Sequence, residues 1–384
     1  MDRRLTASAL DCPVGSGNCS STVTSAPPRR SSQASSRRTG PAPTTTTSVS
    51  TTCPPRPVEA PTVVRRVPSY VRLMAKIGTS DLDVFPLNLG GNVFGWTADQ
   101  ETSFRVLDAY AAAGGNFIDT ADFYSAWAPG NSGGESETVL GQWIAARGNR
   151  DQVVVATKVG MHPEFTGLSS STIAAAAEAS LKRLGTDHID LYYAHRDDPN
   201  TPLEETLRAF DTLVRAGKVR YIAASNYTAP RLAEALAISD REGLARYVAV
   251  QPHYNLVERE HYEGELAQLV AREGLSAMPY FSLAKGFLTG KYRPGAAEVD
   301  SPRAEGAKAY LTESGLAVLD ALDQIAAAHD TTQAAVALAW LAAQPTVAAP
   351  IASARTIEQL ADLLPVAELS LSEDELTLLT KAGN

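Results

Sequence analysis

The stretch Asn116-Phe117-Ile118-Asp119-Thr120-Ala121-Asp122-Phe123-Tyr124 joins a short apolar segment to a polar one. We expect residues 116–118 to form a buried strand, with Asp119 and Tyr124 in the loop that follows. The C-terminal ends of the strands in a parallel barrel meet at one mouth, where catalytic groups gather. If the fold is such a barrel, later strands should also end in ionisable groups.

Two later apolar runs end in this way. Residues 152–157 run into Lys158, and residues 189–194 run into His195. A carboxylate, a phenol, an ammonium and an imidazole at one mouth are suited to proton transfer. Each residue alone also has an ordinary structural explanation, as a cap, a packed ring, a solvated lysine or a core histidine. The combination and order of the four are what predict a proton-transfer site.

The segments around these four residues resemble the aldo-keto reductases, whose catalytic Asp, Tyr, Lys and His occur in this order. The resemblance implies an α/β fold, a (β/α)₈ TIM barrel with an N-terminal β-hairpin cap and extra C-terminal helices. It also implies reversible reduction of aldehydes and ketones, with Tyr124 as general acid and His195 orienting the carbonyl. A tyrosine with a pKa near 10 is a weak acid, so Lys158 would stabilise its phenolate and Asp119 would hold Lys158 in place.

The rest of the chain agrees with a barrel, because apolar runs and amphipathic segments alternate along it. The hairpin is expected at 77–84, and the helix at 170–184 should be capped by Ser170, Ser171 or Thr172. Expected strands are 86–90, 116–118, 152–157, 189–194, 219–223, 247–250, 275–279 and 347–351. Expected helices are 99–113, 135–147, 170–184, 202–216, 229–242, 261–273, 314–329 and 356–364, with extra helices at 331–343 and 372–381.

The cofactor prediction rests on other residues. Ser225 and Asn226 follow the fifth strand and Gln251 follows the sixth; the resemblance implies that their side chains bind the nicotinamide carboxamide. Neutral donors and acceptors are what an amide-bearing ring requires. Without the resemblance, Asn226 would be explained as a turn former and Gln251 as a strand edge.

The same resemblance implies sites for the rest of NADPH/NADP⁺. The implied cofactor residues outside the carboxamide group are Gly91, Asn92, Tyr280, Ser282, Leu283, Gly286, Lys291, Ser353, Arg355 and Gln359. Tyr280 would stack under the nicotinamide, the 282–292 segment would straddle the pyrophosphate, and the start of the last barrel helix would hold the 2′-phosphate. The chain has Ser353 where many members have Gly or Lys, and Leu363 where many have Asn. Arg355 is thus the main cation, which favours NADPH over NADH.

No Gly-x-Gly-x-x-Gly motif follows the first strand, so a Rossmann domain is not implied. All three cysteines, Cys12, Cys19 and Cys53, lie outside the barrel, so the barrel can contain no disulfide and no thiolate metal site, and no metal is expected.

Charge is unevenly distributed along the 384 residues. Residues 1–73 contain ten arginines, no lysine and three acidic residues, a formal charge of +7, which leaves −16 for residues 74–384. An acidic barrel argues against nucleic acid, because phosphate binding needs clustered Lys and Arg. No apolar run reaches the roughly 18 residues of a membrane span. We expect a cytoplasmic protein whose partner is a small-molecule carbonyl substrate; the sequence leaves the oligomeric state open.

The Ser/Thr/Pro/Arg-rich residues 1–73 are expected to be a disordered extension, since they lack a periodic apolar face. An acid-poor, Arg-rich segment also suits an organelle transit peptide. Alternatively, translation begins at Met74, close to the point where the resemblance starts.

The substrate pocket is less specified. Trp96, Phe123 and Trp127 either wall an apolar pocket or pack the fold, and the short C-terminal segment implies an open pocket. Two further functions remain open. One is a non-catalytic NADP(H)-binding regulatory subunit, which potassium-channel β-subunits of this family exemplify. The other is a phosphate-processing barrel without nicotinamide, which Ser225, Asn226 and Gln251 disfavour.

Overall fold

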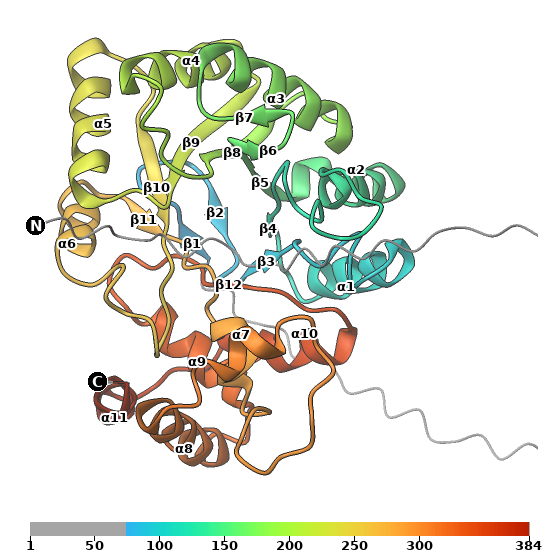
Figure 1. Ribbon diagram of the computed structural model, residues 1–384, viewed down its shortest axis with the longest axis vertical. Coiled ribbons are helices and arrows are strands. Elements are labelled where there is room, and N and C mark those ends of the chain that lie inside the picture. The colour runs from blue at the N-terminus through green and yellow to red at the C-terminus, as the bar shows by residue number, and fades with distance from the viewer. Residues whose placement is uncertain (1–73, 384) are drawn as a thin grey trace, which may run out of the picture. The chain divides into compact units, whose positions relative to one another are not determined.

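Eight parallel strands form the centre of the protein in a computed structural model that describes residues 74–383 (Figure 1). Their order around the sheet is β12-β3-β4-β5-β8-β9-β10-β11, which follows the chain apart from β12. The strands are β3 (Asn88–Gly90), β4 (Phe117–Asp119), β5 (Val154–Val159), β8 (Ile189–Ala194), β9 (Val219–Ser225), β10 (Tyr247–Gln251), β11 (Ser276–Ala277) and β12 (Ile351–Ala352).

Main-chain hydrogen bonds between the regions of β11 and β12, the two ends of the strand order, close this sheet into a barrel. Ala277 pairs with Val347 in an isolated parallel bridge. The Ile351 N–H donates to the Pro279 carbonyl at 2.9 Å. Closure removes the exposed edges that an open sheet would have. The predicted (β/α)₈ barrel is confirmed.

Helices surround the strands on the outside (Figure 1). Those of the eight barrel units are α1 (Gln100–Ala112), α2 (Glu135–Arg147), α3 (Ser170–Leu184), α4 (Leu203–Arg215), α5 (Ala229–Glu242), α6 (Glu265–Arg272), α8 (Glu313–Ala328) and α10 (Ile357–Leu363). The predicted extra helices are α9 (Gln333–Ala342) and α11 (Glu373–Ala382). Helix α4 illustrates the pattern, since its buried Leu203, Leu207 and Phe210 recur at helical spacing and face the core.

The predicted cap of α3 and the predicted start of α6 are wrong for identifiable reasons. The cap of α3 is Ser169, one residue before the predicted set, because its Oγ accepts the Thr172 N–H at 3.2 Å. Helix α6 begins at Glu265 instead of residue 261, because Gly264 has φ 92° and ψ −128°, which no α-helix can include.

A two-stranded hairpin closes the N-terminal end of the barrel. Its strands β1 (Ala75–Lys76) and β2 (Asp83–Val84) pair antiparallel. Ile77, Leu82 and Val84 are buried in one apolar cluster with barrel residues such as Phe117 and Val248. Gly78, at φ +49°, approaches so closely that a Cβ there would lie 2.2 Å from the Val248 carbonyl oxygen. The predicted hairpin cap is therefore present, and we call this end the floor.

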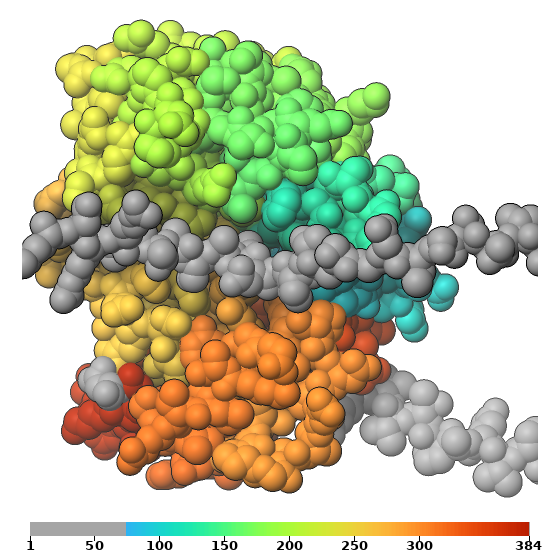
Figure 2. Space-filling view, in the orientation of Figure 1, coloured from blue at the N-terminus to red at the C-terminus, as the bar shows by residue number. Residues whose placement is uncertain are grey.

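Part of the predicted long loop before α8 is regular. It contains the 3₁₀ turn η2 (Ala284–Thr289) and helix α7 (Ala304–Lys308), and Figure 2 shows this orange segment as one continuous packed surface. A small hairpin of β6 (Met161–His162) and β7 (Phe165–Thr166), also unpredicted, follows β5. Short 3₁₀ turns η1 (Arg150–Gln152) and η3 (Leu364–Ala367) complete the elements.

The proposed extension at residues 1–73 lies outside the described residues and stays a prediction. Within residues 74–383, no helix has both the length and the apolar character that a membrane span requires.

Candidate active site

Asp119, Lys158 and His195 lie on three neighbouring strands at the end opposite the floor, which we call the mouth. Asp119 is the last residue of β4, Lys158 is near the end of β5, and His195 directly follows β8. The strand order β4-β5-β8 puts these three positions side by side, and the loop after β4 returns Tyr124 to the same place. The structure therefore brings together the four residues that the sequence predicted.

The Lys158 ammonium lies at the centre of this group. Its Nζ donates hydrogen bonds to Asp119 Oδ2 at 2.6 Å, to the Tyr124 hydroxyl oxygen at 2.7 Å and to the Thr120 carbonyl oxygen at 2.8 Å. The Tyr124 hydroxyl in turn donates to Asp119 Oδ2 at 3.0 Å. All three ammonium protons are thus used, which fixes the lysine in a fully buried position.

The electrostatic surroundings keep the Tyr124 proton in place. Burial raises the pKa of the Tyr124 hydroxyl well above its ordinary value, and the charge and hydrogen bond of Asp119 act in the same direction. Burial also lowers the pKa of the Lys158 ammonium, against the opposing effect of the Asp119 carboxylate. At neutral pH Tyr124 is therefore a protonated phenol, and its oxygen accepts a hydrogen bond from Lys158 Nζ.

His195 lies beside Tyr124, with 6.1 Å between the ring centroids. Its main-chain N–H donates to the Val159 carbonyl at 2.9 Å, which ties it to β5. Burial lowers the pKa of the imidazole well below its ordinary value, and the charges of Lys158 and Arg196 add to the effect. A neutral imidazole at this position has one N–H donor and one acceptor to offer.

A cluster of amide and hydroxyl groups adjoins the four residues. Gln251 Nε2 donates to Asp119 Oδ1 at 2.8 Å, and Ser225 Oγ donates to the Gln251 carbonyl oxygen at 3.0 Å. Asn226 has φ +57°, an uncommon left-handed conformation, and its Nδ2 donates to the His195 carbonyl at 3.0 Å. The Tyr280 hydroxyl donates to Asn226 Oδ1 at 2.8 Å. The predicted carboxamide residues are therefore adjacent to one another and to the catalytic candidates.

The segment after β11 forms a turn with several left-handed backbone conformations. Phe281, Ala284 and Lys285 have positive φ angles, and Gly286 has φ +96°. Buried Ser282 donates from Oγ to the Pro279 carbonyl at 2.9 Å, which holds the turn against the barrel. Backbone held in left-handed conformations costs free energy and concentrates at ligand sites. The predicted pyrophosphate segment, with Leu283 at its start, has this character.

Three cations next to this turn lack a carboxylate partner among residues 74–383: Lys291, Arg303 and Arg355. Burial lowers the pKa of Lys291, and the charges of Arg355 and Arg303 lower it further. Burial also lowers the pKa of Arg303, whose charge acts on both Tyr124 and Arg355. Arg303 and Arg355 are partly buried whereas Lys291 is exposed, and a partly buried cation without a carboxylate partner is costly unless an anion binds beside it.

Arg303 is the functional candidate that the sequence analysis missed. It immediately precedes α7 in a stretch without strand or helix periodicity, so no local pattern marks it. Its guanidinium carbon lies 6.0 Å from the Phe281 ring centroid, which places it beside the left-handed turn. Only the tertiary fold reveals this neighbourhood.

The remaining predicted cofactor residues lie in the loop after β3 and in the segment after β12. Ser353 Oγ donates to Asn92 Oδ1 at 2.7 Å, and a Cβ added to Gly91 would lie 2.9 Å from Ser136 Oγ. The Arg355 main-chain N–H donates to Gln359 Oε1 at 2.9 Å, at the start of the seven-residue helix α10. The loops after β3 and β12 are thus joined beside the mouth.

The aromatic residues suspected of lining a pocket form a connected group with the tyrosine. Trp127 lies 5.5 Å from Trp96, 5.6 Å from Phe123 and 6.1 Å from Tyr124, measured between ring centroids. All four side chains keep partial exposure. An apolar wall therefore borders the Tyr124 ring.

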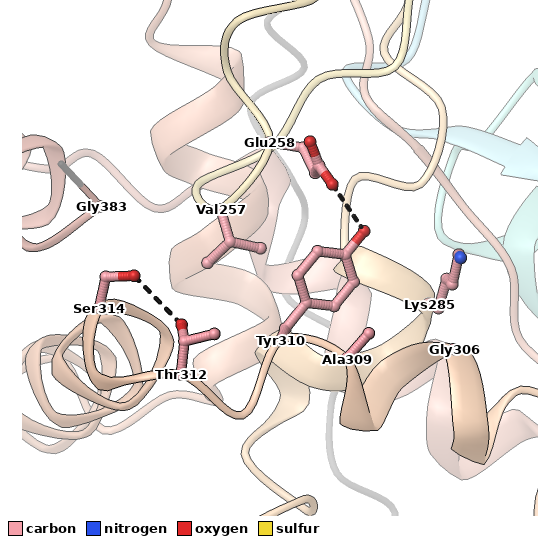
Figure 3. A pocket seen from close by; sticks show the side chains of 9 residues that line it. All are labelled: Val257, Glu258, Lys285, Gly306, Ala309, Tyr310, Thr312, Ser314 and Gly383. Carbon is pink, nitrogen blue, oxygen red and sulfur yellow. Dashed lines mark hydrogen bonds between the residues drawn. The ribbon is translucent and has the colours of Figure 1, made fainter. Parts of the chain in front are cut away.

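A pocket of about 410 Å³ lies elsewhere, between the loop after β10 and helices α7 and α8 (Figure 3). Its lining includes Glu258, Lys285 and Tyr310 but none of the four residues at the mouth. This hollow therefore does not mark the chemistry, which the hydrogen-bonded groups locate instead.

Comparison with known proteins agrees with this geometry. The profile of the "Aldo/keto reductase family" matches residues 86–384. The "Uncharacterized oxidoreductase YrpG" of Bacillus subtilis (strain 168) is 36% identical over 313 residues, covering 79% of this chain and 93% of the relative. A "Probable voltage-gated potassium channel subunit beta" of Arabidopsis thaliana is 34% identical, covering 74% and 88%. "Norsolorinic acid reductase stcV" of Emericella nidulans is 34% identical, covering 80% of each chain. With its barrel and the groups at its mouth, the chain belongs to the aldo/keto reductase family.

Proposed function

We propose that the protein is an NADPH-dependent carbonyl reductase that converts aldehydes or ketones to alcohols, reversibly. The observation that carries the proposal is the Tyr124 hydroxyl at the barrel mouth, 2.7 Å from Lys158 Nζ and 3.0 Å from Asp119 Oδ2. This phenol is partly accessible and keeps its proton at neutral pH, as a general acid for reduction must.

The roles of the four residues follow from their contacts. Tyr124 donates its proton to the carbonyl oxygen as that oxygen gains negative charge, and Lys158 stabilises the resulting phenolate. Asp119 holds Lys158 through the 2.6 Å contact with its ammonium. Neutral His195 donates an N–H to the same carbonyl oxygen and orients it. When bound, NADPH would supply the hydride for the carbonyl carbon, and the cofactor would then be released as NADP⁺.

The polar groups around the mouth fit NADPH. The cations Lys291, Arg303 and Arg355, which have no carboxylate partner among residues 74–383, match its phosphates, and the main-chain N–H groups of the left-handed turn suit an anion. Of the three, we assign Arg355 to the 2′-phosphate. The carboxamide is assigned to Ser225, Asn226 and Gln251, and the nicotinamide face to Tyr280. Gly91, Asn92, Ser282, Leu283, Gly286, Ser353 and Gln359 complete the proposed cofactor site.

Multiple-turnover kinetics test the proposal. NADPH oxidation is followed with a panel of aliphatic and aromatic aldehydes and ketones, and NADPH binding is measured separately by quenching of protein fluorescence. We expect many turnovers with at least one carbonyl, and the aromatic group around Trp127 favours apolar ones. Binding of NADPH without turnover of any carbonyl in the panel contradicts a reductase.

A regulatory NADP(H)-binding subunit is the second candidate, because relatives named as probable potassium-channel β-subunits share 34% identity with this chain. The same experiment separates the two, since a redox-sensing subunit would oxidise about one NADPH per chain and then stall. Absence of fluorescence quenching by NADPH would remove both candidates.

A further inference from the structure

Two histidines and a glutamate in the loop between β10 and α6 form a group outside the mouth. We call His253, Glu258 and His261 the 253–261 cluster. One possible ligand atom from each residue lies within 4.8 Å of the other two, and His261 Nε2 is 3.8 Å from Glu258 Oε2. The two imidazole rings are nearly parallel, with a 14° interplanar angle and 5.7 Å between centroids. Two nitrogen donors and one oxygen donor therefore lie close enough in this loop to reach one ion after a small rotation of the side chains.

Hydrogen bonds of Asn255 hold the loop in this shape. Buried Asn255 exchanges two main-chain hydrogen bonds with Glu258, at 3.0 and 3.2 Å. Its Oδ1 accepts the Val257 N–H at 2.9 Å, and its Nδ2 donates to the Phe281 carbonyl at 2.9 Å. Because Asn255 fixes the turn from His253 to Glu258, little ordering is left for a ligand to impose.

The donor atoms are available. His253 Nε2 is buried and has no hydrogen-bond partner in the described part of the chain. A satisfied core histidine would have one. Glu258 Oε1 accepts the Tyr310 hydroxyl at 3.3 Å (Figure 3), which leaves Oε2 facing His261. A hydrogen bond to the second oxygen of a carboxylate is the usual support for a metal ligand.

The types of donor atom in the cluster indicate which metal ions it suits. Two imidazole nitrogens and one carboxylate oxygen suit Zn²⁺ and neighbouring divalent transition metals, whereas Mg²⁺ and Ca²⁺ prefer sites built from oxygen alone. We propose that the 253–261 cluster binds one divalent transition-metal ion, with Zn²⁺ as the representative, and that water fills the remaining positions. The side chains of His261 and Glu258 are 57% and 27% exposed, so both can make the small adjustment that binding requires.

The 253–261 cluster lies next to Tyr280, a proposed cofactor residue. The His253 ring stacks on Tyr280, with 5.3 Å between centroids and a 16° interplanar angle. Tyr280 in turn donates to Asn226 in the amide cluster. The site is therefore separate from the four residues at the mouth, yet one ring away from a proposed cofactor residue. The proposal does not rest on the proposed reductase activity.

The test is a Zn²⁺ titration of the untagged full-length chain in which Cys12, Cys19 and Cys53 are replaced by serine, since cysteine thiolates also bind zinc. Competition with a chromophoric chelator gives affinity and stoichiometry. We expect one Zn²⁺ per chain, competed by Co²⁺ or Ni²⁺ but not by Mg²⁺. His261→Ala and Glu258→Gln should each weaken binding by at least about tenfold.

His329→Ala is the matched control, because it removes another partly exposed histidine that contacts a glutamate, with His329 Nε2 2.7 Å from Glu375 Oε1. Its affinity should equal that of the parent. Zn²⁺ should also raise the melting temperature of the parent and of His329→Ala, but not of His261→Ala. Lack of stoichiometric binding, or equal affinity in His261→Ala, Glu258→Gln and the control, overturns the proposal.

Discussion

The mouth and the floor are the two ends of one set of strands, yet their residues serve different purposes. At the floor, Phe117 packs against Leu82 and Val84 of the hairpin in an apolar cluster. Two residues further along β4, on the same side of the strand, Asp119 contacts Lys158 and Tyr124. Burial of apolar side chains at the floor stabilises the fold, whereas the buried charged groups at the mouth are held in fixed positions by hydrogen bonds. Substitutions at the two ends should therefore separate stability from chemistry.

The largest expected effect is at the mouth. Tyr124→Phe removes only the phenolic proton donor, so kcat for carbonyl reduction should fall by about 10²–10⁴. NADPH affinity and melting temperature should stay close to those of the parent. Steady-state kinetics, fluorescence titration and thermal unfolding measure the three quantities. Adding Lys158→Met should lower kcat little further, because the two residues act as one unit. Retention of more than about a tenth of kcat, far above the range for a lost general acid, would move the search for the acid to His195.

The floor should show the opposite behaviour. Leu82 is 2% exposed, so Leu82→Ala leaves a cavity against the barrel strands. The free energy of unfolding should fall by about 2–4 kcal/mol, measured by urea denaturation, with kcat and KM unchanged at low temperature. Leu311→Ala, at a position 36% exposed, should cost far less. A drop in kcat in folded Leu82→Ala would show that the two ends are coupled.

Cofactor choice should change more moderately. Arg355→Ala should weaken NADPH binding by about 10–100-fold, the range of a lost charge-assisted hydrogen bond, and hardly affect NADH. Arg293 is the control, because its guanidinium already pairs with Asp320 at 3.0 Å and Arg293→Ala should leave both affinities unchanged. Fluorescence titrations with both cofactors measure the difference. Equal weakening of NADH would assign Arg355 to the fold instead of the 2′-phosphate.

The smallest expected effect concerns a buried carboxyl just past β4. Neither oxygen of Asp122 has a hydrogen-bond partner among the residues described. Burial, with the charge of Glu137, raises the pKa of Asp122 from 3.8 to about 8. The folded state then holds this proton more tightly than the unfolded state, so the stability it contributes is lost as pH rises towards 8.

Asp122→Asn removes this titration. Relative to the parent, the variant should therefore gain about 1–3 kcal/mol of stability between pH 5 and pH 7. Urea unfolding at both pH values measures the change. Asp99→Asn is a contrast, because hydrogen bonds from Thr102 lower the pKa of exposed Asp99 and no such gain should appear. If Asp122→Asn differed from the parent by the same amount at the two pH values, the raised pKa of Asp122 would be contradicted.

Local sequence patterns predicted much of the architecture. Helices α2, α3 and α5 and strand β8 have the predicted bounds, because apolar spacing and glycine stops are local signals. The four residues at the mouth were predictable because each apolar run is followed directly by polar, ionisable residues. Other contacts have no local signal: Gln251 reaches Asp119 across 132 residues, and Arg303 comes from a stretch without periodicity. Such partners are fixed only when the barrel closes.

The short strands β11 and β12 have a dynamic consequence. Strand β9 has seven residues, whereas β11 and β12 have two each, and their region is joined by one isolated bridge and the main-chain hydrogen bond from Ile351 to Pro279. Fewer ladder bonds mean a lower free energy of local opening, so amide hydrogens there should exchange with deuterated solvent earlier than those of β8 and β9. The segments after β11 and β12 carry Lys291 and Arg355. A ligand that contacts both segments would raise the free energy of local opening on this side of the barrel. Binding at the mouth would therefore also slow the opening of the barrel between β11 and β12.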